Sequence, residues 1–249
     1  MRQPIMAGNW KMFKTPAETR AYFEKFRPLV AESSHCRIVI CPPSIDLVAA
    51  ADAATDSNVE IGAQNMCWAK EGAYTGEIAG PMLVAAGCRW VLIAHSERRQ
   101  YFGETSEGSA KKISAALEVG LTPVYCIGET LEERESGRAE MVLESQFHGA
   151  VSHLRVGEFE KVVIAYEPVW AIGTGKVATP EMAQAAHHFI RSQARVRFGD
   201  GAADACRILY GGSVKPDNIK GLMVQPDIDG GLVGGASLDP VSFSCIVNY

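Results

Sequence analysis

The chain has 249 residues, enough for one large domain or two small ones, and 47% of them are apolar, which is ample for a core. The net charge is −5 and no stretch is rich in Lys and Arg, which argues against a nucleic-acid partner but permits a small anionic substrate. No apolar run reaches membrane-spanning length, so we expect no membrane association.

The first residues and the cysteines indicate a cytoplasmic protein. Residues 1–9 contain no signal-peptide stretch, and Lys11 follows closely. The seven cysteines are an odd number and form no CxxC pair, which fits reduced thiols better than a disulfide framework or a zinc site.

Short apolar runs typical of buried strands recur eight times, with helical segments between them. The runs cover residues 5–8, 37–41, 59–63, 90–94, 122–126, 162–166, 207–210 and 228–233. Thr15 and Thr130 begin capping boxes, Thr179 precedes a long amphipathic segment, and Gly120 closes another. Strand then helix, eight times without a linker, predicts an α/β fold in which residues 1–249 form a single (β/α)8 barrel domain, in preference to an open sheet.

In such a barrel the active site lies at the C-terminal ends of the strands, so the polar residues that follow each run are the candidates. They are Asn9, Lys11, Gln64, Asn65, His95, Ser96, Glu97, Arg98, Gly128, Glu129, Glu167, Gly211, Gly212, Ser213, Gly234, Gly235 and Ser237.

Glu167 is the first charge after the sixth run and is a candidate general base. Pro168 biases it to an extended backbone, which places the carboxylate at the end of the strand. The next residues resemble a lid with two hinges and a short apolar tip. They are Pro168, Val169, Trp170, Ala171, Ile172, Gly173, Thr174, Gly175 and Lys176. The alternative is a solvated acid followed by ordinary turn residues.

His95 and Lys11 are the other chemically active candidates. His95 directly follows the fourth run, and N–H groups of a helix beginning at Ser96 would disfavour its imidazolium form, leaving a neutral hydrogen-bond donor. Lys11 would extend its ammonium over the barrel mouth toward an anionic substrate. The alternatives are a structural histidine and a solvated surface lysine.

Glycines follow the seventh and eighth runs, where barrels often bind phosphate. Gly211 with Gly212, just before Ser213, and Gly234 with Gly235 would let backbone N–H groups approach an anion, although one Gly-Gly pair alone is typical of a plain turn. No pair of candidates has metal-ligand spacing, and there is no dinucleotide or Walker motif. We therefore expect proton transfer without a metal or cofactor.

These residues together resemble one family, triosephosphate isomerase. The matching stretches are GNWKM (8–12), GAQNM (62–66), GAYTGE (72–77), AHSERR (94–99), CIGETL (126–131), YEPVWAIGTGK (166–176), YGGSV (210–214) and VGGASL (233–238). They span the chain in order, and their combination is far more specific than any one of them. The resemblance implies a cofactor-independent isomerase that interconverts dihydroxyacetone phosphate and D-glyceraldehyde 3-phosphate through an enediolate in glycolysis and gluconeogenesis.

The resemblance implies a role for each of several residues. Glu167 would move the carbon-bound proton while neutral His95 polarises the carbonyl. Lys11 and Asn9 would bind substrate and stabilise the enediolate. Backbone N–H groups to the phosphate would come from Gly173, Ser213, Gly234 and Gly235.

The resemblance also implies a homodimer, in which Thr75 at the tip of the 72–77 loop inserts into the neighbouring subunit. Glu97, Ser96 and Cys126 would support the site, with Glu97 near Lys11. One departure is Ala94, where the family commonly has glycine; its methyl group would slightly crowd the strand end.

Two other functions compete with this one. A related barrel enzyme would use Lys11 as a Schiff-base nucleophile in an aldolase-like reaction, which requires an uncharged amine. A non-catalytic sugar-phosphate-binding protein would share the fold without the activity.

Overall fold

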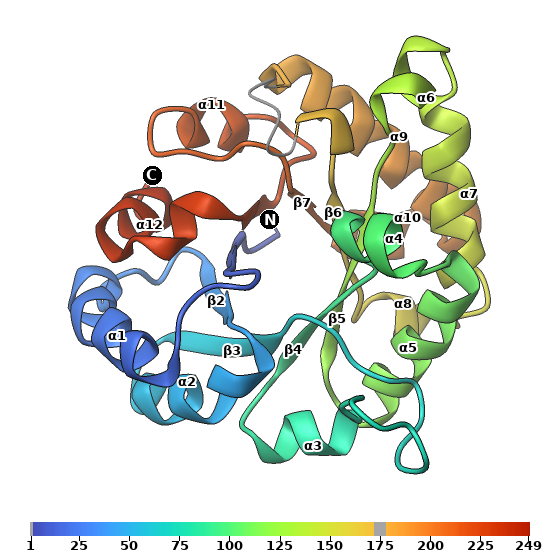
Figure 1. Cartoon of the computed structure of the whole chain (residues 1–249). Coiled ribbons are helices and arrows are strands. Elements are labelled where there is room, and N and C mark those ends of the chain that lie inside the picture. The colour runs from blue at the N-terminus through green and yellow to red at the C-terminus, as the bar shows by residue number, and fades with distance from the viewer. Residues whose placement is uncertain (1, 172–177) are drawn as a thin grey trace.

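A computed structural model describes residues 2–171 and 178–249 of the chain (Figure 1). Eight parallel strands pair in chain order and close into a barrel, because β8 also pairs with β1. The strands are β1 (Ile5–Asn9), β2 (Arg37–Cys41), β3 (Val59–Ala63), β4 (Trp90–Ile93), β5 (Thr122–Ile127), β6 (Val163–Tyr166), β7 (Arg207–Tyr210) and β8 (Gly230–Val233). The predicted (β/α)8 fold is confirmed.

Helices surround the barrel on its outer side (Figure 1). They are α1 (Pro16–Val30), α2 (Leu47–Ala54), α3 (Gly80–Ala85), α4 (Ser96–Phe102), α5 (Ser106–Glu118), α6 (Leu131–Glu135), α7 (Ala139–Val151), α8 (Val156–Phe159), α9 (Pro180–Phe198), α10 (Asp200–Ala205), α11 (Ile219–Met223) and α12 (Pro240–Val247), with short 3₁₀ turns η1 (Ser44–Asp46), η2 (Val169–Ala171) and η3 (Gly235–Leu238). The capping boxes at Thr15 and Thr130 are both present, and Thr179 caps α9. These predicted helix starts are therefore confirmed.

Five strand boundaries differ from the sequence prediction: the ends of β1, β4 and β5 and the starts of β6 and β8. The backbone at β4 and β8 is unusual. β4 ends at Ile93, because Ala94 has a φ of 60°, in the left-handed region where strands do not continue. β8 begins at Gly230 and not at residue 228. Gly230 has a φ of 137° and packs so closely on β1 that a Cβ atom would lie 1.9 Å from the carbonyl oxygen of Ile5, so glycine is required there.

The strands are buried on both faces, which explains their nearly continuous apolar sequences. Ile5 and Ala7 of β1 belong to the core inside the barrel, whereas Met6 belongs to the core between barrel and helices. The inner core consists of Ile5, Ala7, Val39, Cys41, Trp90, Leu92, Val124, Cys126, Val163, Ala165, Leu209 and Leu232. This filled interior supports the residues that stand at its open end.

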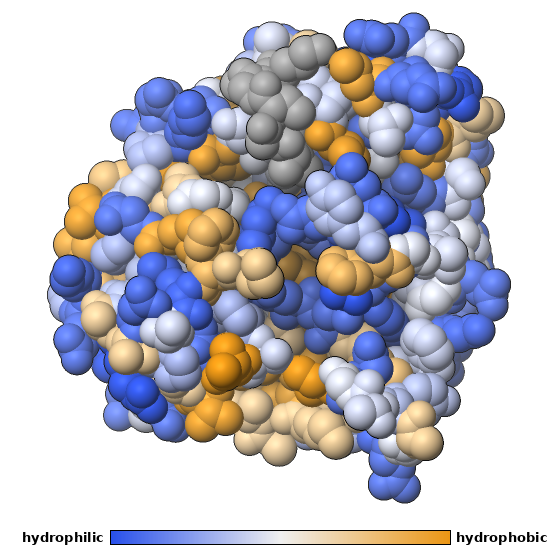
Figure 2. All heavy atoms as spheres, viewed as in Figure 1, coloured by the Kyte–Doolittle hydropathy of each residue, from blue (hydrophilic) through white to orange (hydrophobic). Residues whose placement is uncertain are grey.

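Within the described part of the chain, none of the helices combines the length and apolar character needed to cross a membrane. Figure 2 shows one face of the molecule, on which hydrophilic residues surround a central hollow and hydrophobic residues gather beside it.

Candidate active site

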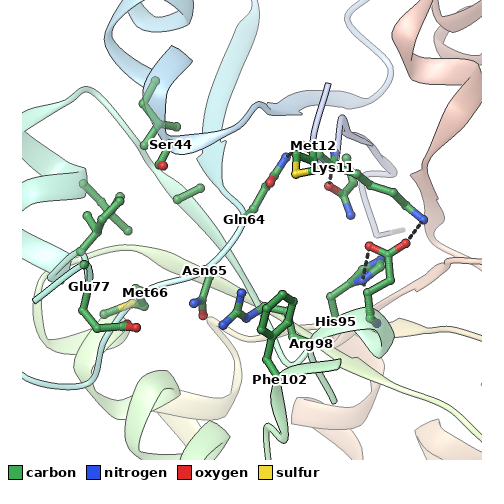
Figure 3. Close-up of a pocket in the computed structure, with 17 residues that line it drawn as sticks. Lys11, Met12, Ser44, Gln64, Asn65, Met66, Glu77, His95, Arg98 and Phe102 are labelled. Atoms are coloured by element: carbon green, nitrogen blue, oxygen red, sulfur yellow. Dashed lines mark hydrogen bonds and ion pairs between the residues drawn. The ribbon is translucent and has the colours of Figure 1, made fainter. Parts of the chain in front are cut away.

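The C-terminal ends of β1, β4 and β6 bring Lys11, His95 and Glu167 together. Lys11 is half-buried, while His95 is 7% exposed and Glu167 only 2% exposed. In Figure 3 the side chains of Lys11 and His95 approach each other across the mouth of the barrel. Lys11 and Glu167, almost 160 positions apart in the sequence, are thus linked through Glu97 and His95.

Two donors hold the Glu167 carboxylate. Oε1 lies 2.9 Å from Nε2 of His95, and Oε2 accepts the backbone N–H of Ser96 at 2.8 Å. Burial raises the pKa of Glu167, but the imidazole of His95 and the N–H of Ser96 lower it more, so the pKa lies below its ordinary value. The carboxyl group is therefore ionised at neutral pH and able to accept a proton.

His95 is the N-cap of α4 as well as a neighbour of Glu167. Its Nδ1 accepts the backbone N–H of Glu97 at 3.3 Å, which leaves the Nε2 proton to be donated to Glu167. Burial lowers the pKa of His95, but the Glu167 and Glu97 carboxylates raise it more, and the net shift is upward. The expected helix N–H is thus in place, while the neutral state of the ring in the working enzyme stays a prediction.

Lys11 is held in a strained conformation by its neighbours. Its φ is 53°, uncommon for a residue with a side chain, and its Nζ lies 2.5 Å from Oε1 of Glu97. The Asn9 side chain accepts the Lys11 N–H at 3.0 Å. Gln64 donates through Nε2 to the backbone carbonyl of Lys11 at 2.8 Å. The backbone N–H and carbonyl of Lys11 are therefore both held by hydrogen bonds.

The glycine loops after β7 and β8 lie at the same end of the barrel. A Cβ atom at Gly234 would lie 3.5 Å from Cε of Lys11, so this glycine borders the lysine side chain directly. Gly235 begins η3 and is exposed. Ser213 is half-buried, and its carbonyl accepts the side-chain N–H of Asn218 at 2.8 Å.

The described part of the predicted lid is anchored on the buried carboxylate of Glu129. Its Oε1 accepts from Tyr166 Oη at 3.0 Å and from Trp170 Nε1 at 2.9 Å, and Arg134 lies 3.1 Å away. Pro168, Val169, Trp170 and Ala171 form the turn that includes η2. Five predicted lid residues lie outside the described ranges, and with them the proposed phosphate contact of Gly173: Ile172, Gly173, Thr174, Gly175 and Lys176.

Cys126 is fully buried on β5 and lines, with Ser96 and Glu167, a cavity of about 460 Å³. Burial and the Glu167 charge raise the pKa of its thiol well above the ordinary value, so it stays protonated. The position fits a supporting role rather than one as a nucleophile.

No role was predicted for Gln64 or Glu129, although both follow predicted strands. The Gln64 side chain donates to the backbone carbonyls of Lys11 and Cys41, and the Glu129 carboxylate accepts from Tyr166 and Trp170 at the start of the predicted lid. Position in the sequence alone does not indicate these contacts. Gln146, whose side chain bonds the backbone N–H and carbonyl of Gly128, was not among the predicted residues. It lies within α7, far from any strand end in the sequence.

Comparison with known proteins places this geometry in a family. A sequence model described as triosephosphate isomerase matches residues 4–249. The chain is 65% identical over its whole length to the triosephosphate isomerase of Solibacter usitatus, covering 100% of both proteins. It is 54% and 53% identical to those of Geobacter metallireducens and Moorella thermoacetica, covering 100% of this chain and 99% of each relative. This chain therefore belongs to the triosephosphate isomerase family.

Proposed function

We propose that the chain interconverts dihydroxyacetone phosphate and D-glyceraldehyde 3-phosphate by proton transfer, without a cofactor. The observation that carries the proposal is the buried Glu167 carboxylate within 2.9 Å of the His95 imidazole, in a family member matched over its full length. A dry carboxylate beside a hydrogen-bond donor is what abstraction of a proton next to a carbonyl requires.

Glu167 acts as the base in both directions. It takes the proton from one substrate carbon and returns it to the neighbouring carbon, so that the substrate gains and loses no atoms. To do so the carboxylate exchanges its contacts with Ser96 and His95 for the substrate C–H. The Nε2–H of His95, released from Glu167, then donates to the carbonyl oxygen on which negative charge develops. The same ring helps to pass the hydroxyl proton from one substrate oxygen to the other, so that the carbonyl and hydroxyl groups exchange places.

Lys11 and Asn9 support the same charge. The Lys11 ammonium lies at the mouth and offers a positive charge to the enediolate and phosphate oxygens. Asn9 is buried and fixes the lysine backbone. Backbone N–H groups of Ser213, Gly234 and Gly235, at the strand ends where barrels bind phosphate, are proposed to hold the phosphate, together with Gly173.

The aldolase-like alternative is disfavoured by the environment of Lys11. Its Nζ is engaged with the Glu97 carboxylate at 2.5 Å, whereas Schiff-base formation needs a neutral amine that is free to attack the substrate carbonyl. Borohydride reduction in the presence of dihydroxyacetone phosphate tests this directly, since a covalent adduct on Lys11 would reject the isomerase mechanism.

A coupled assay tests the proposed function. Purified protein is supplied with glyceraldehyde 3-phosphate, and a glycerol-phosphate dehydrogenase reports the product. Fast turnover that is lost in Glu167→Gln establishes both the reaction and the base. Phosphate-ligand binding without turnover would instead support the non-catalytic binding protein.

We also propose a homodimer. Thr75 is exposed in the 72–77 loop, and a cavity of about 370 Å³ borders Lys11 and is lined by Met12, Glu77 and Phe102 (Figure 3). The stretches of chain that contribute to the lining of this cavity also carry exposed large apolar side chains: Met12, Phe13, Ile45, Trp68, Tyr74, Met82, Tyr101 and Phe102. Apolar surface next to an open cavity favours a protein partner, and the loop of a second copy is the occupant we propose.

Two further properties complete the proposal. We place residues 1–249 in one catalytic domain, since the family match extends over 4–249. We expect the protein to act in the cytoplasm, which its seven unpaired cysteines support.

A further inference from the structure

The backbone of Glu167 lies against two glycines from neighbouring strands. A Cβ atom at Gly128 would lie 1.7 Å from the carbonyl oxygen of Glu167, and one at Gly211 would lie 2.8 Å from its Cγ. The N–H of Glu167 also donates to the carbonyl of Ile127 at 2.8 Å. The base therefore rests directly on the end of β5, and a displacement of Gly128 would displace Glu167.

The side chain of Gln146, in α7, bonds both backbone groups of Gly128. Its Oε1 accepts the N–H of Gly128 at 2.9 Å, and its Nε2 donates to the carbonyl of the same glycine at 3.0 Å. One carboxamide thus gives a donor and an acceptor to one residue, as the backbone of an adjacent strand would. Gln and Asn are the side chains whose primary amide presents an N–H donor and a carbonyl acceptor side by side, as a peptide group does.

Gln146 is itself tied to the other support of Glu167. Tyr125 donates its Oη hydrogen to the Gln146 carbonyl at 2.7 Å, and Arg99 donates to Tyr125 Oη at 2.9 Å. Arg99 lies in α4, whose first residue, Ser96, donates its N–H to the Glu167 carboxylate. The hydrogen-bond network therefore joins α4, β5 and α7 around the base.

We propose that Gln146 is a positioning residue for the reaction: through Gly128 it sets the location of the Glu167 carboxylate for proton transfer. The inference rests on the proposed function of Glu167. It predicts an effect on the chemical step and not on substrate binding, because the hydrogen bonds of Gln146 go to Gly128 and Tyr125, beside the base, and not to the loops after β7 and β8. Small displacements of a reacting group cost rate steeply, on the order of 10²-fold for 1 Å.

The substitution Gln146→Glu tests this because it is isosteric. At pH 8 the introduced carboxylate presents an acceptor to the carbonyl of Gly128, where a donor is needed. Its protonated form restores one O–H donor and one acceptor. Contact with a carbonyl and partial burial raise the pKa of the introduced carboxyl group. We therefore expect it to take up its proton, and so regain a donor, at a pH at which activity can still be measured.

We expect kcat of Gln146→Glu to fall at least ~10-fold at pH 8, with KM within ~3-fold of wild type. The ratio of variant to wild-type kcat should then rise as the pH is lowered. Charged and titratable groups that face the same cavity are Arg99, Cys126, Glu133 and Glu167, and Tyr125 contacts the Gln146 backbone. Gln146→Met leaves all of them in place but carries neither donor nor acceptor, so its kcat ratio should be low and independent of pH.

Gln193→Glu is the matched control in the neighbouring helix α9, where Oε1 contacts His148 Nε2 at 3.1 Å, and it should leave kcat within ~2-fold. A wild-type kcat for Gln146→Glu at pH 8, or a ratio that does not change with pH, would overturn the proposal. If neither variant at 146 folds, Tyr125→Phe decides: a kcat loss of ~3-fold or more at constant KM supports the network, and wild-type kcat refutes it. Wild-type turnover tests the proposed function separately, so the two failures are distinguishable.

Discussion

Oε1 of Glu167 lies 2.9 Å from Nε2 of His95, so the proposed base and the proposed electrophile are bonded to each other before either acts on substrate. Each perturbs the other: His95 is a main cause of the lowered pKa of Glu167, and Glu167 is a main cause of the raised pKa of His95. Binding of substrate must break this contact and give each partner a new one.

The first prediction concerns Glu167→Gln. The amide has nearly the same shape but cannot take up a proton, so kcat should fall by at least ~10³. Affinity for a phosphate-containing inhibitor should stay within ~10-fold, because the phosphate loops are unchanged. Steady-state kinetics and calorimetric titration give the two numbers, and near-normal turnover would remove Glu167 from the role of base.

The second prediction is a change in the titration of His95. In Glu167→Gln the charge that raises the pKa of His95 is lost, while burial and the Lys11 ammonium, which both lower it, remain. The pKa of His95 should therefore drop relative to wild type, and the neutral ring should persist to lower pH. Nitrogen-15 NMR of the imidazole measures this, with exposed His188 as an internal reference. An unchanged or higher pKa would contradict the pairing.

A third prediction concerns Ala94, which is fully buried with a φ of 60°. Ala94→Val places a β-branched residue in the left-handed region and should destabilise the fold by about 2 kcal/mol or more. Ala94→Gly relieves the strain but loses a buried methyl group and adds chain entropy, so its stability should lie within about 1 kcal/mol of wild type. Urea unfolding at one protein concentration compares the three proteins; equal stabilities would show that the backbone is unstrained.

The fourth prediction tests the proposed dimer. Thr75→Arg adds bulk and charge at the tip of the 72–77 loop, so it should shift sedimentation toward the monomer and reduce activity together. Glu144→Arg, an equally exposed change on α7, serves as the control and should do neither. Unchanged sedimentation with full activity in the first variant would count against a loop that crosses between subunits.

The sequence predicted the barrel because each strand is a short apolar run between clear helix signals. The same pattern indicated the candidate site, since Lys11, His95 and Glu167 each follow a run at the end where barrel active sites lie. It did not predict that residues 96–118 form two helices, α4 and α5. That break depends on Gly103, whose φ of 66° ends α4, and an isolated glycine in a helical sequence does not by itself indicate this.

Contacts across long sequence separations were also beyond prediction. Arg191 is buried in α9, where it forms ion pairs with Asp227 at 2.6 Å and Asp229 at 2.7 Å. In the sequence it is indistinguishable from a charged residue on the exposed face of a helix. Gln146 is a similar case, since its partner Gly128 lies on another element. Such pairs become visible only when the strands and helices are placed in space.

Because His95 caps α4, its proposed role in the reaction and its role in the fold meet at one position. A replacement must offer an acceptor to the N–H of Glu97 to preserve the start of the helix, and a donor toward the substrate to preserve the reaction. Few side chains satisfy both demands, and those of asparagine, serine and threonine, which carry a donor and an acceptor, are shorter than imidazole. Substitution of residue 95 is therefore restricted by two requirements, the stability of the helix start and the proposed reaction. A substitution that satisfies one of them is still excluded if it fails the other.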